Sequence, residues 1–424
     1  MIYLQVVSVQ IGLVSNMKYG LIGEKLGHSF SKVIHEKIAD YTYELKEISK
    51  ENLDAFMKAK DFSCINVTIP YKEEVIPYLD YIDSAAREIG AVNTIVNRDG
   101  KLYGYNTDFY GMKLMIEKNG FNLKDSKVLI LGSGGTAKTS EAVSASLGAR
   151  NIVIVSRKGE VNYENLASLH SDADFIINTT PLGMYPNNDS FAVDPALFPG
   201  LKGIIDAVYN PLKTTIVQKG EELGVKGVNG LYMLVAQAVV AAEKFMGKAL
   251  DAEKISDEVY GEIIKEKQNI VLIGMPGSGK STVGKALAEK LSRFFVDTDD
   301  VITEKHGVIS EIFAQKGEEY FRDIESEAVK EVAKKGGIVI ATGGGAVLRK
   351  ENVRALKQNG VVFFLDRPLE DIMPTSDRPL SSDIESLKKR FEERYPIYKV
   401  TGDFEINIDG NVENAVNKIM ECIL

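Results

Sequence analysis

A glycine-rich stretch at residues 274–282 (GMPGSGKST) combines one lysine with two hydroxyl residues. An apolar run over residues 270–273 precedes it, and a helical pattern over residues 283–291 follows it. Strand, glycine-rich loop and helix in this order are typical of a P-loop, which holds a triphosphate with backbone N–H groups and the positive end of the helix. We expect the phosphates of a nucleoside triphosphate to be bound by Gly277, Ser278, Gly279, Lys280, Ser281 and Thr282, with Ser281 also a ligand of Mg²⁺.

Further polar clusters follow the P-loop. A short apolar strand at 294–299 is expected to end in two carboxylates, Asp297 and Asp299, that share one face. Arg322 stands in a charged helical stretch at 317–325, and Gly343, Gly344 and Gly345 follow an apolar strand at 338–341.

Two arginines lie near the end of the chain, Arg378 in DRPL and Arg394 in RYPIY. A purely structural role is also open for some of the residues in this half of the chain. Arg322 could pair with neighbours on its helix, and Ile384, Leu387, Phe391 and Tyr395 are spaced as the apolar face of an amphipathic helix.

The first half of the chain carries its own polar clusters. Ser29 and Ser31 would share a face in an extended segment, and the stretch at 66–72 (NVTIPYK) delivers Thr68 and, just after a proline, Lys72. Asn93 stands in GAVNT and Asp108 in GYNTD. Taken singly, hydroxyl and Asx residues are common in turns, and a lysine is usually a solvated surface charge.

A second glycine-rich motif follows a strand at 127–131 and reads G-x-G-x-x-A. A helix at 136–147 and a second strand at 151–155 come next, which predicts a Rossmann βαβ unit. The second strand ends in Ser-Arg-Lys where an NAD site usually has an acidic residue, so the sequence favours NADP over NAD, although Glu160 lies near. The expected NADP(H) contacts are Gly132, Ser133, Gly134, Gly135, Thr136, Ala137, Ser156, Arg157 and Lys158.

Two more strands, at 174–178 and 203–206, end in polar or glycine-rich loops, which in a parallel sheet lie at the edge where ligands bind. A nearly apolar helix at 231–245 contains Gln237, and a buried glutamine needs hydrogen-bond partners.

The composition and net charge of the chain limit the classes of partner that it can bind. The chain has 424 residues, 44% of them hydrophobic and 26% charged, which indicates a globular protein of two or three domains. Its formal net charge of -9 argues against nucleic acid or an anionic membrane as partner, and no apolar run is long enough for a membrane span. Two distant cysteines, Cys64 and Cys422, fit a reducing cytoplasm. Residues 1–16 are expected to be a poorly structured leader, and oligomeric state is left open.

From Met17 to about residue 250 the chain resembles shikimate dehydrogenase, through Ser29/Ser31, NVTIPYK, GAVNT, NTD, GSGGTA, NTTPLGM, DAVYNP and GLYMLVAQA in that order. The resemblance implies that Ser29, Ser31, Thr68, Asn93, Asp108 and Gln237 hold shikimate, and that Lys72 and Asp108 are the catalytic pair. It also implies that Tyr209 and Gly230 border the nicotinamide and the substrate. Reduction of a ketone leaves an alkoxide, which the Lys72 ammonium can protonate while Asp108 orients it.

Residues 269–424 resemble shikimate kinase. The resemblance implies a five-stranded parallel sheet, ATP-Mg²⁺ at Lys280 and Ser281, Asp297 near the metal, and Arg378 closing from a lid onto ATP. Shikimate would be held by Asp299, Arg322, Gly343, Gly344, Gly345 and Arg394, with Asp299 orienting the attacking hydroxyl. The lid segment between Asp366 and Arg378 (RPLEDIMPTSD) is shorter than in the family, and we expect it to lack an earlier arginine.

These observations predict an α/β chain with four parts after the leader. They are an α/β substrate-binding domain (17–107 plus about 231–250), a Rossmann NADP domain (108–230), a helical linker (251–268) and a P-loop kinase domain (269–424). The predicted function is bifunctional: 3-dehydroshikimate is reduced to shikimate with NADPH, and shikimate is then phosphorylated with ATP, on the way to chorismate and the aromatic amino acids.

Two alternatives stay open. A metabolite sensor without catalysis is one, although the presence of Lys72, Asp108 and Lys280 speaks against it. A quinate/shikimate dehydrogenase that uses NAD, fused to a weak kinase, is the other, and the Ser156-Arg157-Lys158 sequence counts against it.

Overall fold

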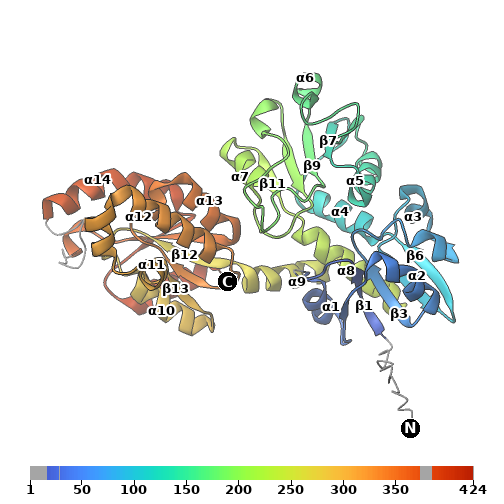
Figure 1. Ribbon diagram of the computed structural model, residues 1–424, viewed down its shortest axis with the longest axis horizontal. Helices are drawn as coiled ribbons and strands as arrows, with labels where there is room; N and C mark the ends of the chain where they lie inside the picture. The colour runs from blue at the N-terminus through green and yellow to red at the C-terminus, as the bar shows by residue number, and fades with distance from the viewer. Residues whose placement is uncertain (1–16, 28, 373–383, 424) are drawn as a thin grey trace, which may run out of the picture. The chain divides into compact units, whose positions relative to one another are not determined.

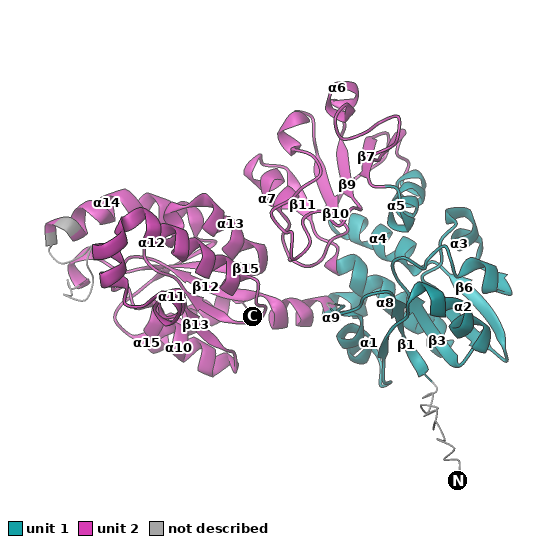
Figure 2. Ribbon diagram, viewed as in Figure 1, with its two compact units in different colours: residues 1–120, 133–147, 232–259 teal, residues 121–132, 148–231, 260–424 magenta. Residues whose placement is uncertain are grey.

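The structure is a computed structural model that describes residues 17–27, 29–372 and 384–423 (Figure 1). Its chain forms two compact units (Figure 2). The first contains the described residues up to 120 together with 133–147 and 232–259, and the second contains 121–132, 148–231 and the described residues from 260 onward. Three sheets are present in the described residues, one in the first unit and two in the second.

The sheet of the first unit has six strands in the order β2-β1-β3-β5-β6-β4. The pairs β1–β2, β1–β3 and β4–β6 are parallel, whereas β5 runs antiparallel to β3 and β6. Because β1 and β3 are parallel neighbours, the loops that follow them meet at one edge of the sheet. The strands are β1 (Met17–Gly23), β2 (Glu44–Glu47), β3 (Phe62–Val67), β4 (Tyr81–Ile82), β5 (Thr94–Arg98) and β6 (Lys101–Tyr105).

Helices accompany this sheet, and their ends follow ordinary capping chemistry. The Asn106 side chain accepts a hydrogen bond from the backbone N–H of Phe109 and so caps α4, which places Asp108 in the first helical turn. The helices are α1 (Ser31–Ile38), α2 (Lys50–Ala59), α3 (Ser84–Ile89), α4 (Thr107–Lys118), α5 (Gly135–Ser146) and α8 (Leu231–Met246).

The second sheet has five parallel strands in the order β11-β10-β9-β7-β8. Its strands β7 and β9 are buried along their whole length, as expected for a sheet covered on both faces. The strands are β7 (Lys127–Leu131), β8 (Asn151–Val155), β9 (Phe175–Asn178), β10 (Gly203–Asp206) and β11 (Lys226–Val228), with α6 (Leu166–His170) and α7 (Thr215–Glu222) between them in the sequence.

The third sheet is also parallel, in the order β13-β14-β12-β15-β16. Its central strand β12 leads into the P-loop, and the helix α10 starts at Lys280. The strands are β12 (Asn269–Ile273), β13 (Phe295–Asp297), β14 (Val339–Ala341), β15 (Gly360–Asp366) and β16 (Phe404–Asn407). The helices are α10 (Lys280–Leu291), α11 (Thr298–His306), α12 (Ile309–Ala333), α13 (Lys350–Asn359), α14 (Ile384–Thr401) and α15 (Val412–Ile423).

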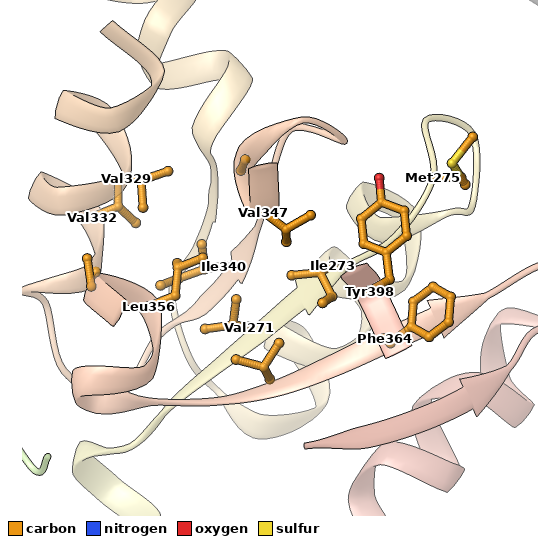
Figure 3. Close-up of a cluster of buried hydrophobic side chains, with 14 of the residues drawn as sticks. Val271, Ile273, Met275, Val329, Val332, Ile340, Val347, Leu356, Phe364 and Tyr398 are labelled. Atoms are coloured by element: carbon orange, nitrogen blue, oxygen red, sulfur yellow. The ribbon is translucent and has the colours of Figure 1, made fainter. Parts of the chain in front are cut away.

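Alternation along β12 gives this sheet a core on each face. Val271 and Ile273 belong to one buried cluster, whereas Ile270 and Leu272 belong to the other. Figure 3 shows the first cluster, in which Val271 and Ile273 lie near Phe364 of β15 and Tyr398 of α14. Stacking of Phe364 on Tyr398, with ring centroids 5.4 Å apart, fixes α14 against the sheet.

The α/β class, the Rossmann-type sheet and the five-stranded parallel P-loop sheet that the sequence predicts are confirmed. The segment predicted as a helical linker contains α9 (Ala252–Lys267). One local prediction is wrong: Asp297 and Asp299 do not share a strand face, because β13 ends at Asp297 and the chain turns into α11 at Thr298. Among the helices that the structure describes, none combines the length and the apolar content needed to cross a bilayer.

Candidate active sites

The first candidate site is built around an ion pair between Lys72 and Asp108. Lys72 Nζ donates a hydrogen bond of 2.6 Å to Asp108 Oδ2, and the two side chains are only 15% and 9% exposed. A charge pair that is largely shielded from water interacts more strongly than an exposed one. The ammonium group is therefore held at one fixed place beside a carboxylate.

The segment at residues 91–93 positions both members of this pair. The backbone N–H of Val92 donates to the carbonyl of Lys72 across 2.8 Å. The side-chain amide of Asn106, which caps α4, donates to the carbonyl of Ala91 across 3.0 Å. The lysine loop and the start of the helix that carries Asp108 are thus tied to the same short segment.

Buried amide and hydroxyl groups adjoin the ion pair. Asn93 Oδ1 accepts a hydrogen bond of 2.7 Å from the backbone N–H of Thr107, and Asn93 Nδ2 donates to Thr107 Oγ1 across 3.0 Å. Gln237 Oε1, on α8, lies 3.3 Å from Thr107 Oγ1 and 3.4 Å from Asn93 Nδ2. Gln237 therefore has the partners that its burial requires, and the network can also present polar atoms to a hydroxylated ligand.

The remaining expected contacts for shikimate stand at the edge where β1 and β3 end. Thr68 is half-buried directly after β3, and its backbone N–H donates to the carbonyl of Ile22 in β1. Ser29 Oγ accepts a hydrogen bond of 3.2 Å from the backbone N–H of Ser31, at the start of α1. Within the described part of the chain, no hydrogen bond joins Ser29 or Ser31 to the Lys72–Asp108 pair.

The expected dinucleotide residues lie at the carboxyl ends of strands β7 and β8. Gly132 follows β7 with a φ of +115°, and a Cβ there would approach Thr179 Oγ1 to 2.6 Å, so the turn requires glycine. Ser133 to Ala137 connect β7 to α5 and form the first turn of that helix. After β8, Ser156 is half-buried, whereas Arg157 and Lys158 are exposed.

Two further expected residues stand near the end of β10. Tyr209 is half-buried in the loop that follows this strand. Gly230 donates its backbone N–H to the carbonyl of Val208, and a Cβ at Gly230 would overlap the carbonyl of Ala207. Asp206 at the strand end is fully buried, and burial raises its pKa to about 7 against hydrogen bonds from Thr214, Val208 and Asn178.

The second candidate site is a cavity of about 600 Å³ in the P-loop half, large enough for a nucleotide and a small substrate. Many of the residues that line it carry charged or hydroxyl side chains. From the expected set, the cavity is lined by Gly277, Gly279, Lys280, Ser281, Thr282, Asp297, Asp299, Arg322, Gly343, Gly344, Gly345 and Arg394. Ser278, the remaining expected residue of the P-loop, is buried and does not line it, and Arg378 lies outside the described residues.

The P-loop holds its lysine and hydroxyl in defined places. Lys280 Nζ donates to the carbonyls of Gly274 and Met275, at 3.0 and 2.9 Å. Ser281 Oγ donates to Asp297 Oδ2 across 2.6 Å, so these two oxygens can share one Mg²⁺. No cluster of three or more His, Cys, Asp or Glu that could hold a metal occurs in the described residues.

Asp299 is one of three acidic residues that line the cavity, together with Asp297 and Glu325. Its Oδ1 is sealed from solvent and has no hydrogen-bond partner within the described residues. Burial, with smaller contributions from Asp297 and Glu325, raises the pKa of Asp299 to about 6. An unpartnered acceptor in a cavity is suited to receive a hydrogen bond from a substrate hydroxyl.

Arg322 faces the cavity from α12 and is held by two carboxylates. Nη1 donates to Glu325 Oε2 across 2.7 Å, and Nη2 donates to Glu318 Oε1 across 2.9 Å. Arg322 therefore pairs with carboxylates on its own helix, as the structural interpretation predicts, and also lines the cavity. Burial raises the pKa of Glu325, against the opposing effect of Arg322.

The glycine triplet allows side chains to approach the backbone closely. A Cβ at Gly343 would lie 2.6 Å from Asp299 Oδ1, and one at Gly345 would overlap the Arg322 guanidinium. Behind the triplet, the Tyr398 hydroxyl donates to the carbonyl of Gly344. The loop is thus supported from α14, the helix that also carries Arg394.

Several residues of these sites, Arg390 in the lining of the cavity among them, were not singled out from the sequence. Thr107 joins Asn93 to Gln237, and Glu325 holds Arg322; the second could have been found, because residues three apart on a helix are neighbours. Arg367, the first residue of the lid segment, lines the cavity, so the expectation that this segment lacks an earlier arginine is wrong.

Comparison with known proteins matches the two halves separately. Residues 21–95 match the shikimate dehydrogenase substrate binding domain family, and residues 276–424 match the shikimate kinase family. Shikimate dehydrogenase (NADP(+)) of Clostridium perfringens is 40% identical over 265 residues, which are 58% of this chain and 97% of that protein. The enzyme of the same name from Methanococcus maripaludis is 37% identical over 272 residues, covering 58% of this chain and 96% of the relative.

Solved structures give the same result for the first part of the chain. A chorismate mutase/shikimate 5-dehydrogenase fusion protein from Clostridium acetobutylicum is 38% identical with a TM-score of 0.55, covering 58% of this chain and 96% of that one. Shikimate dehydrogenase 1 from Peptoclostridium difficile is 36% identical with a TM-score of 0.55, covering 58% and 97%. The chain therefore belongs to the shikimate dehydrogenase family, and it is a fusion whose carboxyl-terminal part matches the shikimate kinase family.

Proposed function

We propose that this chain is a bifunctional shikimate-pathway enzyme, which reduces 3-dehydroshikimate to shikimate with NADPH and phosphorylates shikimate at the 3-hydroxyl with ATP. The observation that carries the proposal is the coexistence in one chain of the Lys72–Asp108 pair and of a cavity with a P-loop on one wall and Asp299, Arg322 and Arg394 on the others. The first suits reduction of a ketone, and the second suits phosphoryl transfer to a carboxylated alcohol.

In the reduction, bound NADPH supplies the hydride. The ammonium of Lys72 stands ready to give its proton to the alkoxide oxygen that the reduction creates, which leaves a neutral amine. Asp108 holds that ammonium in place through the 2.6 Å contact and can accept a hydrogen bond from a substrate hydroxyl with its other oxygen. Asn93, Thr107 and Gln237 offer polar atoms for the other hydroxyl groups.

The cofactor assignment rests on Gly132 and on the exposed cations after β8. Gly132 takes a backbone conformation that favours glycine, as a tight turn before a dinucleotide phosphate requires. Arg157 and Lys158 can pair with a 2′-phosphate, for which an acidic side chain at that place would be unfavourable. We propose Ser156 and the residues from Gly132 to Ala137 as the other contacts, with Tyr209 and Gly230 near the nicotinamide.

In the phosphorylation, Lys280 and the P-loop N–H groups hold the ATP phosphates, and Ser281 with Asp297 holds Mg²⁺. Arg322 and Arg394 bind the carboxylate of shikimate. Asp299 accepts a hydrogen bond from the attacking hydroxyl, and the glycine triplet lets the substrate approach the backbone.

We further propose that residues 17–107 with 231–250, residues 108–230 and residues 269–424 act as the substrate-binding, NADP and kinase domains. The partners are small molecules, in keeping with the acidic charge of the chain, and the compartment is the cytoplasm, in keeping with its two distant cysteines.

One reaction mixture tests both activities. The purified chain is incubated with 3-dehydroshikimate, NADPH, ATP and Mg²⁺, and the products are identified by mass spectrometry. Shikimate 3-phosphate is expected. Shikimate alone would remove the kinase activity from the proposal, and unchanged 3-dehydroshikimate would refute the dehydrogenase reaction.

A further inference from the structure

An arginine that the described chemistry does not use stands beside the P-loop. Arg367 directly follows β15, and β15 pairs in parallel with β12, the strand that leads into the P-loop, with Ile273 opposite Phe364. Pro368 comes next and restricts Arg367 to an extended backbone. The chain therefore leaves the sheet at the edge where the P-loop begins.

Close packing of the two strand ends brings the guanidinium to the loop. Gly274, the first glycine of the P-loop, has a φ of +147°, and a Cβ there would lie 2.7 Å from the carbonyl of Leu365. Arg367 Nη1 donates to the carbonyl of Gly277 across 3.3 Å, and Arg367 lines the same cavity as Lys280 and Ser281.

Few protein groups accept hydrogen bonds from the Arg367 guanidinium. Its Nε is buried without a partner among the described residues, and no ion pair of Arg367 occurs within them. The adjacent carboxylate, Asp366, accepts instead from the Tyr395 hydroxyl across 2.9 Å. Arg322, in the same cavity, is by contrast held by two carboxylates. Arg367 as a whole is half-buried, and a guanidinium whose donors are not taken up by protein acceptors can bind an anion.

We propose that Arg367 binds the phosphate groups of the nucleotide in the kinase half, an inference that rests on the proposed kinase function. The P-loop carbonyl that it contacts belongs to the turn whose N–H groups face those phosphates. A guanidinium there presents planar donors to phosphate oxygens and adds positive charge to that of Lys280. Arg367 is thus a ligand of the nucleotide, and shikimate is bound by other residues.

The test measures binding of ADP with Mg²⁺ by titration calorimetry, which does not depend on turnover. Arg367→Gln removes the charge at similar length, and Arg367→Lys keeps it. We expect the Kd of ADP to rise about tenfold or more in Arg367→Gln, as for loss of a hydrogen bond to a charged group, and less in Arg367→Lys. The KM for shikimate should change by less than about twofold, because a nucleotide ligand contributes little to binding of the other substrate.

Arg349→Gln is the matched control. Arg349 belongs to the same half, but its guanidinium pairs with Asp323 and Glu319 and does not line the cavity, so ADP affinity should be unchanged. NADPH-dependent reduction by each variant shows that the rest of the chain is folded, and a melting curve shows whether the kinase half is weakened.

Two results would overturn the inference. One is an unchanged Kd for ADP in Arg367→Gln, and the other is an equal loss in Arg367→Gln and Arg367→Lys together with a lower Tm, which would give Arg367 only a structural role. Failure of the kinase function itself has a different signature: the unmodified chain would bind ADP but leave shikimate unphosphorylated. An unmodified chain that does not bind ADP would refute both.

Discussion

Asp108 Oδ2 lies 2.6 Å from Lys72 Nζ, although the two residues come from a loop after β3 and from the first turn of α4. Both side chains are largely buried, so the carboxylate is the fixed partner of the ammonium rather than a transient surface contact. In the proposed reduction, this pair would supply a proton donor that is held in one place by its partner carboxylate.

Replacement of Lys72 tests this donor. In Lys72→Met the NADPH-dependent reduction should fall about 100-fold or more, because the alkoxide oxygen loses its general acid. Lys138→Met is the control, since Lys138 makes an exposed ion pair with Glu73. Steady-state rates with 3-dehydroshikimate measure the effect, and shikimate phosphorylation should be normal in both variants. A Lys72→Met enzyme with full reductase activity would contradict the role.

The coenzyme preference gives a second prediction. Arg157→Ala should raise the KM for NADPH about tenfold or more and leave that for NADH nearly unchanged, because only NADPH carries the 2′-phosphate. Arg150→Ala serves as the control, since Arg150 precedes β8 at its opposite end. Rates over a range of each coenzyme provide the measurement. If both coenzymes lose affinity equally, the 2′-phosphate is not the ligand of Arg157.

The sequence predicts the sheets and most of the site because their signals are local. The P-loop and the G-x-G-x-x-A turn combine a strand, a glycine-specific backbone and a helix within a few residues, so pattern alone locates Gly132 and Lys280. The uninterrupted apolar run at 270–273 likewise predicts a strand buried on both faces.

Contacts between segments that are far apart in the sequence could not be predicted from it, because they depend on how the folded chain packs. Thr107 and Gln237 stand in separate motifs that are 130 residues apart. Nothing in either motif predicts that their side chains lie within hydrogen-bond distance of each other. The turn at Asp297 was missed for a related reason: two carboxylates two residues apart fit a strand face, but the first of them caps a helix and accepts from the backbone N–H of Asp299.

Asp299 predicts the pH dependence of the kinase reaction. Its pKa of about 6 is raised from an ordinary aspartate value, so the carboxylate that we propose as the acceptor for the substrate hydroxyl is protonated at a higher pH than usual. The kcat/KM for shikimate should be flat above this pKa and decline as the pH falls through about 6.

Two variants separate Asp299 from other acidic groups. Asp299→Asn should lower kcat about 100-fold and remove the acidic decline, because the titrating acceptor is gone. Asp300→Asn changes the exposed neighbour on the same helix. Its charge is the smallest of the causes that raise the pKa of Asp299, so this variant should keep the acidic decline and shift it only slightly to lower pH. A decline that persists near pH 6 in Asp299→Asn would assign the titration to another group.

The glycine triplet yields the last prediction. Gly345 has a φ of -98°, so alanine is acceptable for the backbone, but its Cβ would overlap the Arg322 guanidinium. That guanidinium cannot move freely, because Glu325 and Glu318 hold it at 2.7 and 2.9 Å. Gly345→Ala should therefore displace Arg322 and raise the KM for shikimate about tenfold or more, with the KM for ATP little changed.

Gly261→Ala is the matched control for this change. Gly261 lies within α9, where no heavy atom stands within 4 Å of the added Cβ, so alanine should leave both activities unchanged and favour the helix slightly. Kinase assays over ranges of shikimate and ATP distinguish the two substrates. A Gly345→Ala enzyme with normal affinity for shikimate would show that Arg322 can shift without loss of the carboxylate contact, and would move that role to Arg394.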